Sequence, residues 1–223
     1  TKSATEQSLT EMMVGKKVSL NIERTAPVNP QNRIELKNVT TLNAEGVKAV
    51  DDISFDIRSG EILGIAGIAG SGQRELLETI AGLQKPESGE IFYHSPEGET
   101  VDLKAKTPTQ IKELGVRLSF VPEDRLGIAE KIIESLEVVT PGATTPVRRL
   151  SGGNVQKVLV GREIAANPKV LMAAYPVRGL DINSSYTIYN LLTKQKENGV
   201  AVVFVGEDLD VLVELCDRIM VIN

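Results

Sequence analysis

The segment Ile62-Leu-Gly-Ile-Ala-Gly-Ile-Ala-Gly-Ser-Gly-Gln-Arg-Glu75 decides the fold of this chain. It begins with the apolar run Ile62–Ala66, which is typical of a strand that is buried on both faces of a parallel sheet. A glycine-rich loop follows the run, and a helix is predicted over Gln73–Leu83. Such a loop between a strand and a helix N-terminus can direct several backbone N–H groups at one anion. The segment is therefore a candidate phosphate-binding loop.

Two side chains differ from those that a phosphate-binding loop of the form G-x-x-x-x-G-K-[ST] supplies. There a lysine neutralises the β- and γ-phosphates and a hydroxyl holds Mg²⁺, but here these positions are Gln73 and Arg74. An amide brings no charge, and a guanidinium repels a metal ion. The sequence thus predicts a phosphate-binding scaffold whose catalytic chemistry is damaged. A loop without any ligand stays open as an alternative. A dinucleotide-binding loop is disfavoured, because Gly64, Gly67 and Gly70 have the wrong spacing.

The composition restricts the class of protein further. The chain has 223 residues, of which 41% are hydrophobic and 25% are charged, so it can bury one core of ordinary domain size. A single cysteine, Cys216, and a single histidine, His94, exclude a disulfide framework, a cysteine-based zinc cluster and Cys–His catalysis. A net charge of −5 argues against a nucleic-acid partner. No apolar run approaches the ~18 residues of a membrane helix, and the cysteine usage leads us to expect a cytoplasmic protein.

Strand-like runs alternate with helix-like runs along the chain. This order predicts an α/β fold with a mostly parallel sheet, helices on both of its faces and an antiparallel β subdomain. The antiparallel strands are expected at Ile34–Val39 and Ile53–Ile57, where apolar and polar residues alternate. The other expected strands are Val116–Val121, Val170–Ala174, Ala201–Val205 and Ile219–Ile222, and the other expected helices are Pro108–Leu114, Asn154–Ala166, Ser184–Asn198 and Leu209–Cys216.

Three further motifs follow the glycine-rich loop. Leu150-Ser-Gly-Gly-Asn154 opens a predicted helix, with Ser151 as a natural N-cap. Pro176-Val-Arg-Gly-Leu-Asp181 follows one buried strand, and Gly206-Glu207-Asp208 follows the next. Each motif alone is compatible with an ordinary strand end or a capped helix start. The ordered set, however, resembles the nucleotide-binding domain of ATP-binding-cassette (ABC) transporters over residues 34–223, which implies a sheet of the P-loop NTPase type.

Finer details resemble the second cassette of tandem importer ATPases for simple sugars and nucleosides. These details are Val121-Pro-Glu-Asp-Arg125, Leu150–Asn154 and Ala173–Asp181. In addition, Glu11-Met-Met-Val-Gly-Lys16 resembles the helix that ends the first cassette of such proteins. The resemblance implies that residues 1–32 are the tail of a preceding cassette with a linker, and that residues 33–223 are the nucleotide-binding domain. A decorated N-terminus of the same domain is the alternative for residues 1–32.

Six positions that carry catalytic or metal-supporting groups in the family are occupied here by other residues. Gln73 stands at the position of the phosphate lysine, and Arg74 at that of the Mg²⁺ hydroxyl. Glu123 replaces the glutamine that senses the γ-phosphate, and Ala174 replaces the Walker B aspartate. Tyr175 replaces the glutamate that polarises the attacking water, and Glu207 replaces the switch histidine. Phosphoryl transfer depends on charge stabilisation by such groups. We therefore expect this half to hydrolyse no ATP by itself.

Other functional positions of the family match residues of this chain. The resemblance assigns nucleotide contact to Gly67, Ala69, Gly70, Ser71, Gly72, Gln73, Arg74 and Glu75. It assigns the signature loop and the cassette interface to Ser151, Gly152, Gly153, Asn154, Gln156 and Asp181. No metal ligand is predicted, and no aromatic residue stands near Thr41–Asn43, where a ring that stacks on adenine is expected.

The resemblance also implies a ligand and partners. The expected ligand is ATP, which this site could hold without Mg²⁺. In the family two cassettes pair head to tail, so the signature loop is expected to complete the ATP site of a partner cassette in the N-terminal half of the same polypeptide. Transmembrane permease subunits are the other expected partners, with no nucleic acid, and the expected location is the inner face of the cell membrane.

The stretch between Glu123 and Leu150 departs from the family pattern. A helical subdomain that docks on the membrane partner normally lies there, but residues 124–149 are too few for its usual helices. Either the subdomain is shortened at about 126–149 or a stretch is missing from the sequence, and we favour the second. Two other functions stay open: a competent ATPase that uses Glu207 as its base, and a structural or regulatory cassette that binds no nucleotide.

Overall fold

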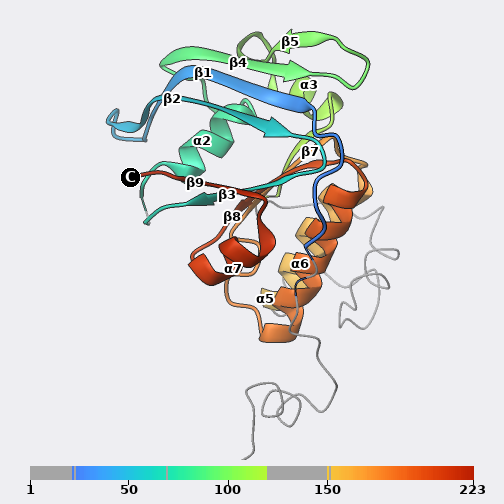
Figure 1. Ribbon diagram of the computed structural model, residues 1–223. Helices are drawn as coiled ribbons and strands as arrows, with labels where there is room; N and C mark the ends of the chain where they lie inside the picture. The colour runs from blue at the N-terminus through green and yellow to red at the C-terminus, as the bar shows by residue number, and fades with distance from the viewer. Residues whose placement is uncertain (1–21, 23, 69, 120–149, 151) are drawn as a thin grey trace, which may run out of the picture.

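The computed structural model describes residues 22, 24–68, 70–119, 150 and 152–223. In this part of the chain two sheets lie one above the other, with a helix between them (Figure 1). The upper sheet is antiparallel and has the strand order β2-β1-β4-β5. Its strands are β1 (Asn32–Leu42), β2 (Lys48–Arg58), β4 (Ser88–His94) and β5 (Thr100–Asp102).

The lower sheet is parallel and has the strand order β6-β7-β8-β3-β9. Its strands are β3 (Ile62–Ala66), β6 (Val116–Ser119), β7 (Val170–Ala174), β8 (Ala201–Val205) and β9 (Arg218–Val221). Helix α2 (Gln73–Ile80) lies between the sheets, and α3 (Pro108–Glu113) precedes β6. The helices α5 (Gly152–Ala165), α6 (Ile182–Glu197) and α7 (Leu209–Leu215) cover the opposite face of the parallel sheet (Figure 1).

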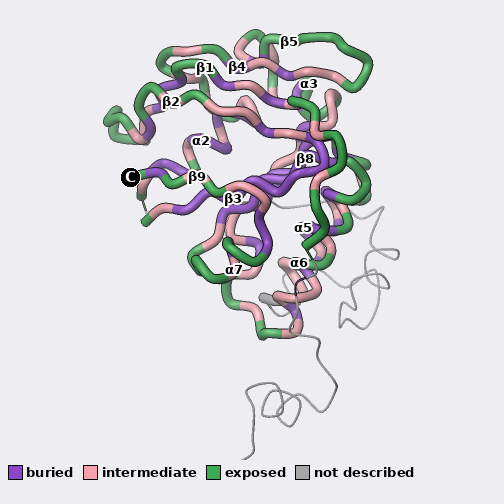
Figure 2. Tube along the Cα trace, in the orientation of Figure 1, coloured by how far each residue is buried: buried purple, intermediate pink, exposed green. Residues whose placement is uncertain are grey.

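The parallel sheet is buried on both faces, as its continuous apolar runs predict. Every residue of β3 and of β8 is buried, and Figure 2 shows these central strands in the buried colour. Leu63 and Ile65 belong to the core between the two sheets, whereas Ile62 and Ala66 belong to the core under α6 and α7. This alternation follows the period of two along a strand. Burial of such aliphatic side chains stabilises the fold by about 1.5–3 kcal/mol each.

The fold class is confirmed, and the bounds of β3, β7 and β8 match the sequence prediction. The prediction for α2 was too long, because the helix ends at Ile80 rather than Leu83. Gly82 has a φ of +73°, which takes the backbone out of the helical region. The capping box of α3 is present as predicted, with the Thr107 hydroxyl accepting from the N–H of Gln110.

Two strands were missed, and several bounds shift. Strands β4 and β5 were not predicted, because in β4 only Ile91 and Tyr93 are buried and β5 is three residues long. The antiparallel strands β1 and β2 are longer than predicted, because they pair along a hairpin up to Leu42 and Lys48. The predicted strand Val116–Val121 is a strand as far as Ser119, and its last two residues lie outside the described residues.

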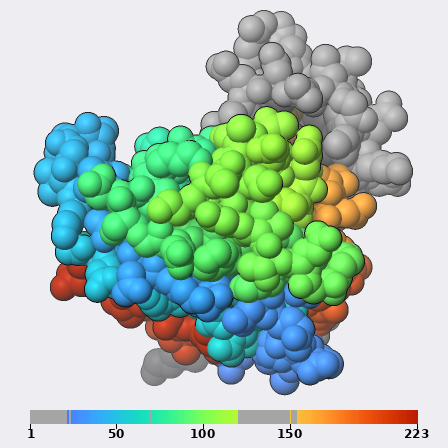
Figure 3. Space-filling model, turned by 90° about the horizontal axis from the view of Figure 1, so that it is seen from above, coloured from blue at the N-terminus to red at the C-terminus, as the bar shows by residue number. Residues whose placement is uncertain are grey.

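The antiparallel sheet forms the roof of the molecule. Figure 3 views it from above, and the hairpin between β1 and β2 projects at one side. Residues 24–31 lead into β1 without regular secondary structure and run beside α6 (Figure 1). None of the helices in the described ranges is long and apolar enough to span a membrane.

Candidate functional site

The sheet topology brings three of the predicted motifs to one edge. Ile65 of β3 pairs with Val205 of β8, and Val205 pairs with Ala174 of β7, so these strands end in one row. The glycine-rich loop, Gly206-Glu207 and Tyr175 follow directly after that row. The carboxyl ends of parallel strands are where such sheets bind ligands. This edge is therefore the candidate site.

The glycine-rich loop ends in a helix N-terminus without a side-chain cap. Gly72 occupies the N-cap position of α2 with φ +88°, and as a glycine it provides no side-chain cap. A Cβ on Gly72 would lie 2.3 Å from the carbonyl oxygen of Ala49 in β2, so no larger residue fits. Uncapped N–H groups and the helix dipole favour an anion here. The sequence missed the contribution of β2, since nothing in the pattern of Ala49 marks it as a neighbour of the loop.

The Gln73 side chain is turned into the loop. It is 2% exposed, and its Nε2 donates to the carbonyl oxygen of Ile68 at 3.3 Å. A Cβ built on Gly67 would lie 2.3 Å from that Nε2, and 2.7 Å from the carbonyl oxygen of Ile222. Gln73 thus fills the space beside Gly67 with a neutral amide that hydrogen-bonds to the loop itself.

Arg74 interacts with its own helix. Its Nε lies 2.7 Å from Oε1 of Glu78, one turn further along α2. The hydrogen bond to Glu78 raises the pKa of the Arg74 guanidinium above its ordinary value. A guanidinium has donors only and cannot coordinate a cation. Position 74 is therefore unsuited to Mg²⁺, which needs oxygen ligands.

The ends of β7 and β8 carry the other replaced positions. Ala174 is the last residue of β7 and offers only a methyl group. Tyr175 adopts φ +49°, a left-handed conformation that costs a non-glycine residue about 1–2 kcal/mol, and its N–H donates to the carbonyl oxygen of Val205 at 2.9 Å. Burial, followed by the charge of Glu207, raises the pKa of the Tyr175 hydroxyl. Glu207 itself is exposed and lies 3.7 Å from Nε of Arg178.

Asp181 is brought near this edge by the turn after β7, and it caps α6. Its Oδ1 accepts from the N–H of Ser184 at 3.0 Å, and its Oδ2 accepts from the Ser184 hydroxyl at 2.7 Å. The hydrogen bonds from Ser184 lower the pKa of the Asp181 carboxyl. The capping role was missed, although an aspartate before a helical run is a common N-cap signal. Its interface role stays a prediction.

The signature motif is described only in part. Helix α5 begins at Gly152, two residues before the predicted start, and Asn154 and Gln156 are half-buried on it. Glu75 is half-buried in the first turn of α2. The predicted positions Ala69, Glu123 and Ser151 and the stretch 126–149 lie outside the described residues. Within the described ranges, no three His, Cys, Asp or Glu side chains stand together as a metal site would require.

Solved structures with the same architecture are ATP-binding cassettes. The chain is similar to a nucleotide-free cassette from an ABC transporter, with a TM-score of 0.73, 22% identity, and coverage of 86% of this chain and 88% of that one. It is also similar to a bacterial ABC transporter cassette solved as a dimer, with a TM-score of 0.71, 25% identity, and coverage of 85% and 94%. The fold and the loop at its sheet edge thus define the class, an ABC-type nucleotide-binding cassette.

The sequence comparison agrees with the class. The family model described as ABC transporter matches residues 50–176, more than half of the chain. The chain belongs to the ABC transporter family.

Curated relatives are import ATP-binding proteins. The chain is 32% identical to the guanosine import ATP-binding protein of Bacillus subtilis, with 97% of this chain and 48% of that protein covered. It is 32% identical to the ribose import ATP-binding protein of Corynebacterium glutamicum, with 98% and 46% covered. The chain therefore spans about half the length of these relatives. The guanosine importer alignment runs over 253 residues, although this chain has 223, so the relative has residues without a counterpart here.

Proposed function

We propose that this chain is the nucleotide-binding, energy-coupling domain of an ABC importer for sugars or nucleosides, and the half of it that does not hydrolyse ATP. The relatives named above support the importer class, since they are import proteins for guanosine and ribose. A xylose import protein of Thermoanaerobacter pseudethanolicus, 31% identical over 98% of the chain, supports it as well.

The position of Gln73 carries the proposal. The N-terminus of α2 is free of a side-chain cap and can receive a phosphate, but the side chain that would neutralise it is an amide buried in the loop. Nucleotide would be held by the backbone N–H groups of Gly70–Arg74 and by the helix dipole. Backbone amides bind a ground state as well as a transition state, so binding without turnover is the expected result.

The residues present do not fit Mg²⁺. Arg74 stands at the hydroxyl position and Ala174 at the carboxylate position, and neither offers an oxygen ligand. Tyr175 and Glu207 replace the residues that would polarise the attacking water and contact the γ-phosphate. ATP binding at this site should therefore not require Mg²⁺.

The second part of the proposal concerns the signature loop. Ser151, Gly152, Gly153 and Asn154 would complete the ATP site of a partner cassette, with Asp181 at the interface between the two. We place that partner in the N-terminal half of the same polypeptide because Glu11–Lys16 resembles the helix that ends a first cassette, and the half-length match to the relatives is compatible with a second half. Permease subunits would hold the pair at the inner face of the cell membrane.

The test of this part is a substitution in the full-length protein. Ser151→Arg should abolish ATP turnover at the partner's site, because a long cation would stand where a small hydroxyl closes that site. Lys194→Met, a change at an exposed residue of α6 outside the functional motifs, is the control and should leave turnover within about twofold. Unchanged turnover in Ser151→Arg would refute the composite site.

A cassette without nucleotide is the second candidate, and one observation favours it. The Gln73 amide donates to the Ile68 carbonyl oxygen and fills the space beside Gly67. The loop therefore packs against its own side chain without a bound anion. Equilibrium binding of ATP, with and without Mg²⁺, separates the two candidates.

A further inference from the structure

Residues 22 and 24–27, which we call the strap, are bound to the cassette at several points. Ile22 is 8% exposed and belongs to the core under α6 and α7. The Arg24 Nη1 donates to two carbonyl oxygens at the C-terminal end of α7, at 3.2 Å to Val213 and 3.0 Å to Cys216. A cation at the C-terminal end of a helix is favourably placed. These contacts were not predicted, because residues 1–32 were interpreted as the tail of a preceding cassette with a linker.

The buried ion pair of Lys196 and Asp217 contacts the strap. The Lys196 ammonium, at 2% exposure, lies 2.7 Å from Oδ1 of Asp217, at 7% exposure. The same ammonium donates to the carbonyl oxygen of Thr25 in the strap. A buried ammonium needs its donors satisfied, and loss of one partner leaves an uncompensated charge. Lys196 therefore depends on the strap for one of its two described hydrogen bonds.

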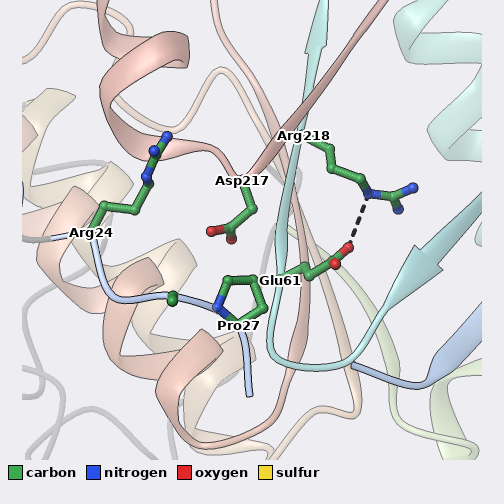
Figure 4. A pocket seen from close by; sticks show the side chains of 6 residues that line it. Arg24, Pro27, Glu61, Asp217 and Arg218 are labelled. Atoms are coloured by element: carbon green, nitrogen blue, oxygen red, sulfur yellow. Dashed lines mark hydrogen bonds and ion pairs between the residues drawn. The ribbon is translucent and has the colours of Figure 1, made fainter. Parts of the chain in front are cut away.

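The same ion pair is hydrogen-bonded to β3, the strand that leads to the glycine-rich loop. Oδ2 of Asp217 accepts from the N–H of Ile62, the first residue of β3, at 2.8 Å. Beside it, Arg218 binds Glu61 at 3.0 Å and Asp56 at 2.9 Å. A pocket of about 330 Å³ lies between the strap and these residues, lined by Arg24, Ala26, Pro27, Glu61, Asp217 and Arg218. Figure 4 shows Arg24 and Pro27 on the strap beside Asp217, and the ion pair of Arg218 with Glu61.

We propose that the strap is a fixed part of the cassette's rigid unit, locked by Lys196 and Asp217, and not a flexible linker. A displacement of the strap would then reach the start of β3 through Lys196 and Asp217. If the preceding segment belongs to the partner cassette, as proposed above, the strap is a mechanical connection between the halves. The docking itself needs no nucleotide, so its test is independent of that proposal.

The first measurement is tryptic cleavage of the native 223-residue chain after Arg24. A docked strap should resist cleavage, and Lys196→Met should speed it by about tenfold or more, because local opening sets the rate of such cuts. Lys194→Met, an exposed lysine on the same helix, is the matched control and should change the rate by less than about twofold. Cleavage that is equally fast in the wild-type chain and in Lys196→Met would overturn the proposal.

The second measurement keeps the test valid if Lys196→Met unfolds the whole chain. Arg24→Ala removes the two described carbonyl contacts at the end of α7 and leaves the Lys196–Asp217 pair in place. It should raise the labelling rate of the buried thiol of Cys216 by about tenfold under native conditions, since access requires local opening. A labelling rate equal to that of the wild type would contradict a docked strap. Accelerated cleavage at many sites in Arg24→Ala would show global unfolding and would count against a local lock.

Discussion

The side-chain amide of Gln73 lies against the α-carbon of Gly67, with 2.3 Å between Gln73 Nε2 and the position that a Cβ on Gly67 would take. Gly67 is thus required for packing, because only glycine leaves room for the amide. Gly67 and Gln73 stand at the two ends of the glycine-rich loop. Their contact keeps the loop packed although position 73 carries a neutral side chain in place of a lysine.

We predict that Gly67→Ala destabilises the chain by roughly 1–3 kcal/mol, the usual cost of an overpacked site. The added methyl group would collide with Gln73 Nε2 and with the backbone carbonyl of Ile222. Urea unfolding measures the free energy of unfolding. Gln73→Ala in the same chain should relieve part of the cost, because one of the two collisions disappears. Equal costs in both backgrounds would show that Gln73 does not occupy this space.

We predict that Gln73→Lys lowers the stability of the nucleotide-free chain, because an ammonium would be buried where an amide is 2% exposed. ATP should raise the melting temperature of this variant more than that of the wild type, since phosphate compensates the buried charge. Hydrolysis should not return, because Ala174 and Tyr175 still lack carboxylates. The checks are a thermal shift with and without ATP, and phosphate release. Mg²⁺-dependent turnover in this single variant would contradict the account.

We predict that Asp181→Ala costs about 0.5–2 kcal/mol by removing the N-cap of α6. The pKa of the Asp181 carboxyl is lowered in the folded state by its hydrogen bonds to Ser184. Its charge-dependent contribution is therefore present above the ordinary aspartate pKa of about 3.9, and it is lost as the pH falls through the lower folded value. Urea unfolding of both proteins at pH 7 and at pH 3 tests this. The difference between them should shrink at pH 3, and a difference of the same size at both pH values would show that the carboxylate charge does not matter.

We predict that Lys196→Met costs more stability than Lys194→Met. Lys196 is buried against Asp217, whereas Lys194 is exposed on the same helix. Removal of one partner of a buried ion pair typically costs about 3–5 kcal/mol, because the other charge stays buried. Lys196→Met combined with Asp217→Asn should recover part of the loss. A double variant as unstable as the sum of the single changes would show no coupling between the two residues.

The fold was largely predictable because the strands of the parallel sheet are continuous apolar runs. The run from Ile62 to Ala66 can be satisfied only by burial on both faces, and the alternation with helical segments then fixes the class. Strand β4 escaped prediction because it is half exposed, with only Ile91 and Tyr93 buried. One pairing partner, β1, is far away in sequence, and the other, β5, is only three residues long, so the local pattern carried little information.

The site was predictable as a set of positions but not as a set of contacts. Sequence spacing placed Gln73 at the first position of the helix, yet the direction of its amide depends on the space that Gly67 and Ile222 leave. The strap was missed for a similar reason. The Thr25 carbonyl carries no side-chain signal, and its partner Lys196 lies 171 positions away.

The central claim is that this cassette binds nucleotide through loop amides and does not hydrolyse it. The most direct measurement incubates the 223-residue chain with ATP, in Mg²⁺ or in a chelator, and determines both bound nucleotide and released phosphate. The account predicts bound, intact ATP in both conditions and no phosphate above the buffer background. Mg²⁺-dependent phosphate release, or the absence of bound nucleotide in both conditions, would contradict it.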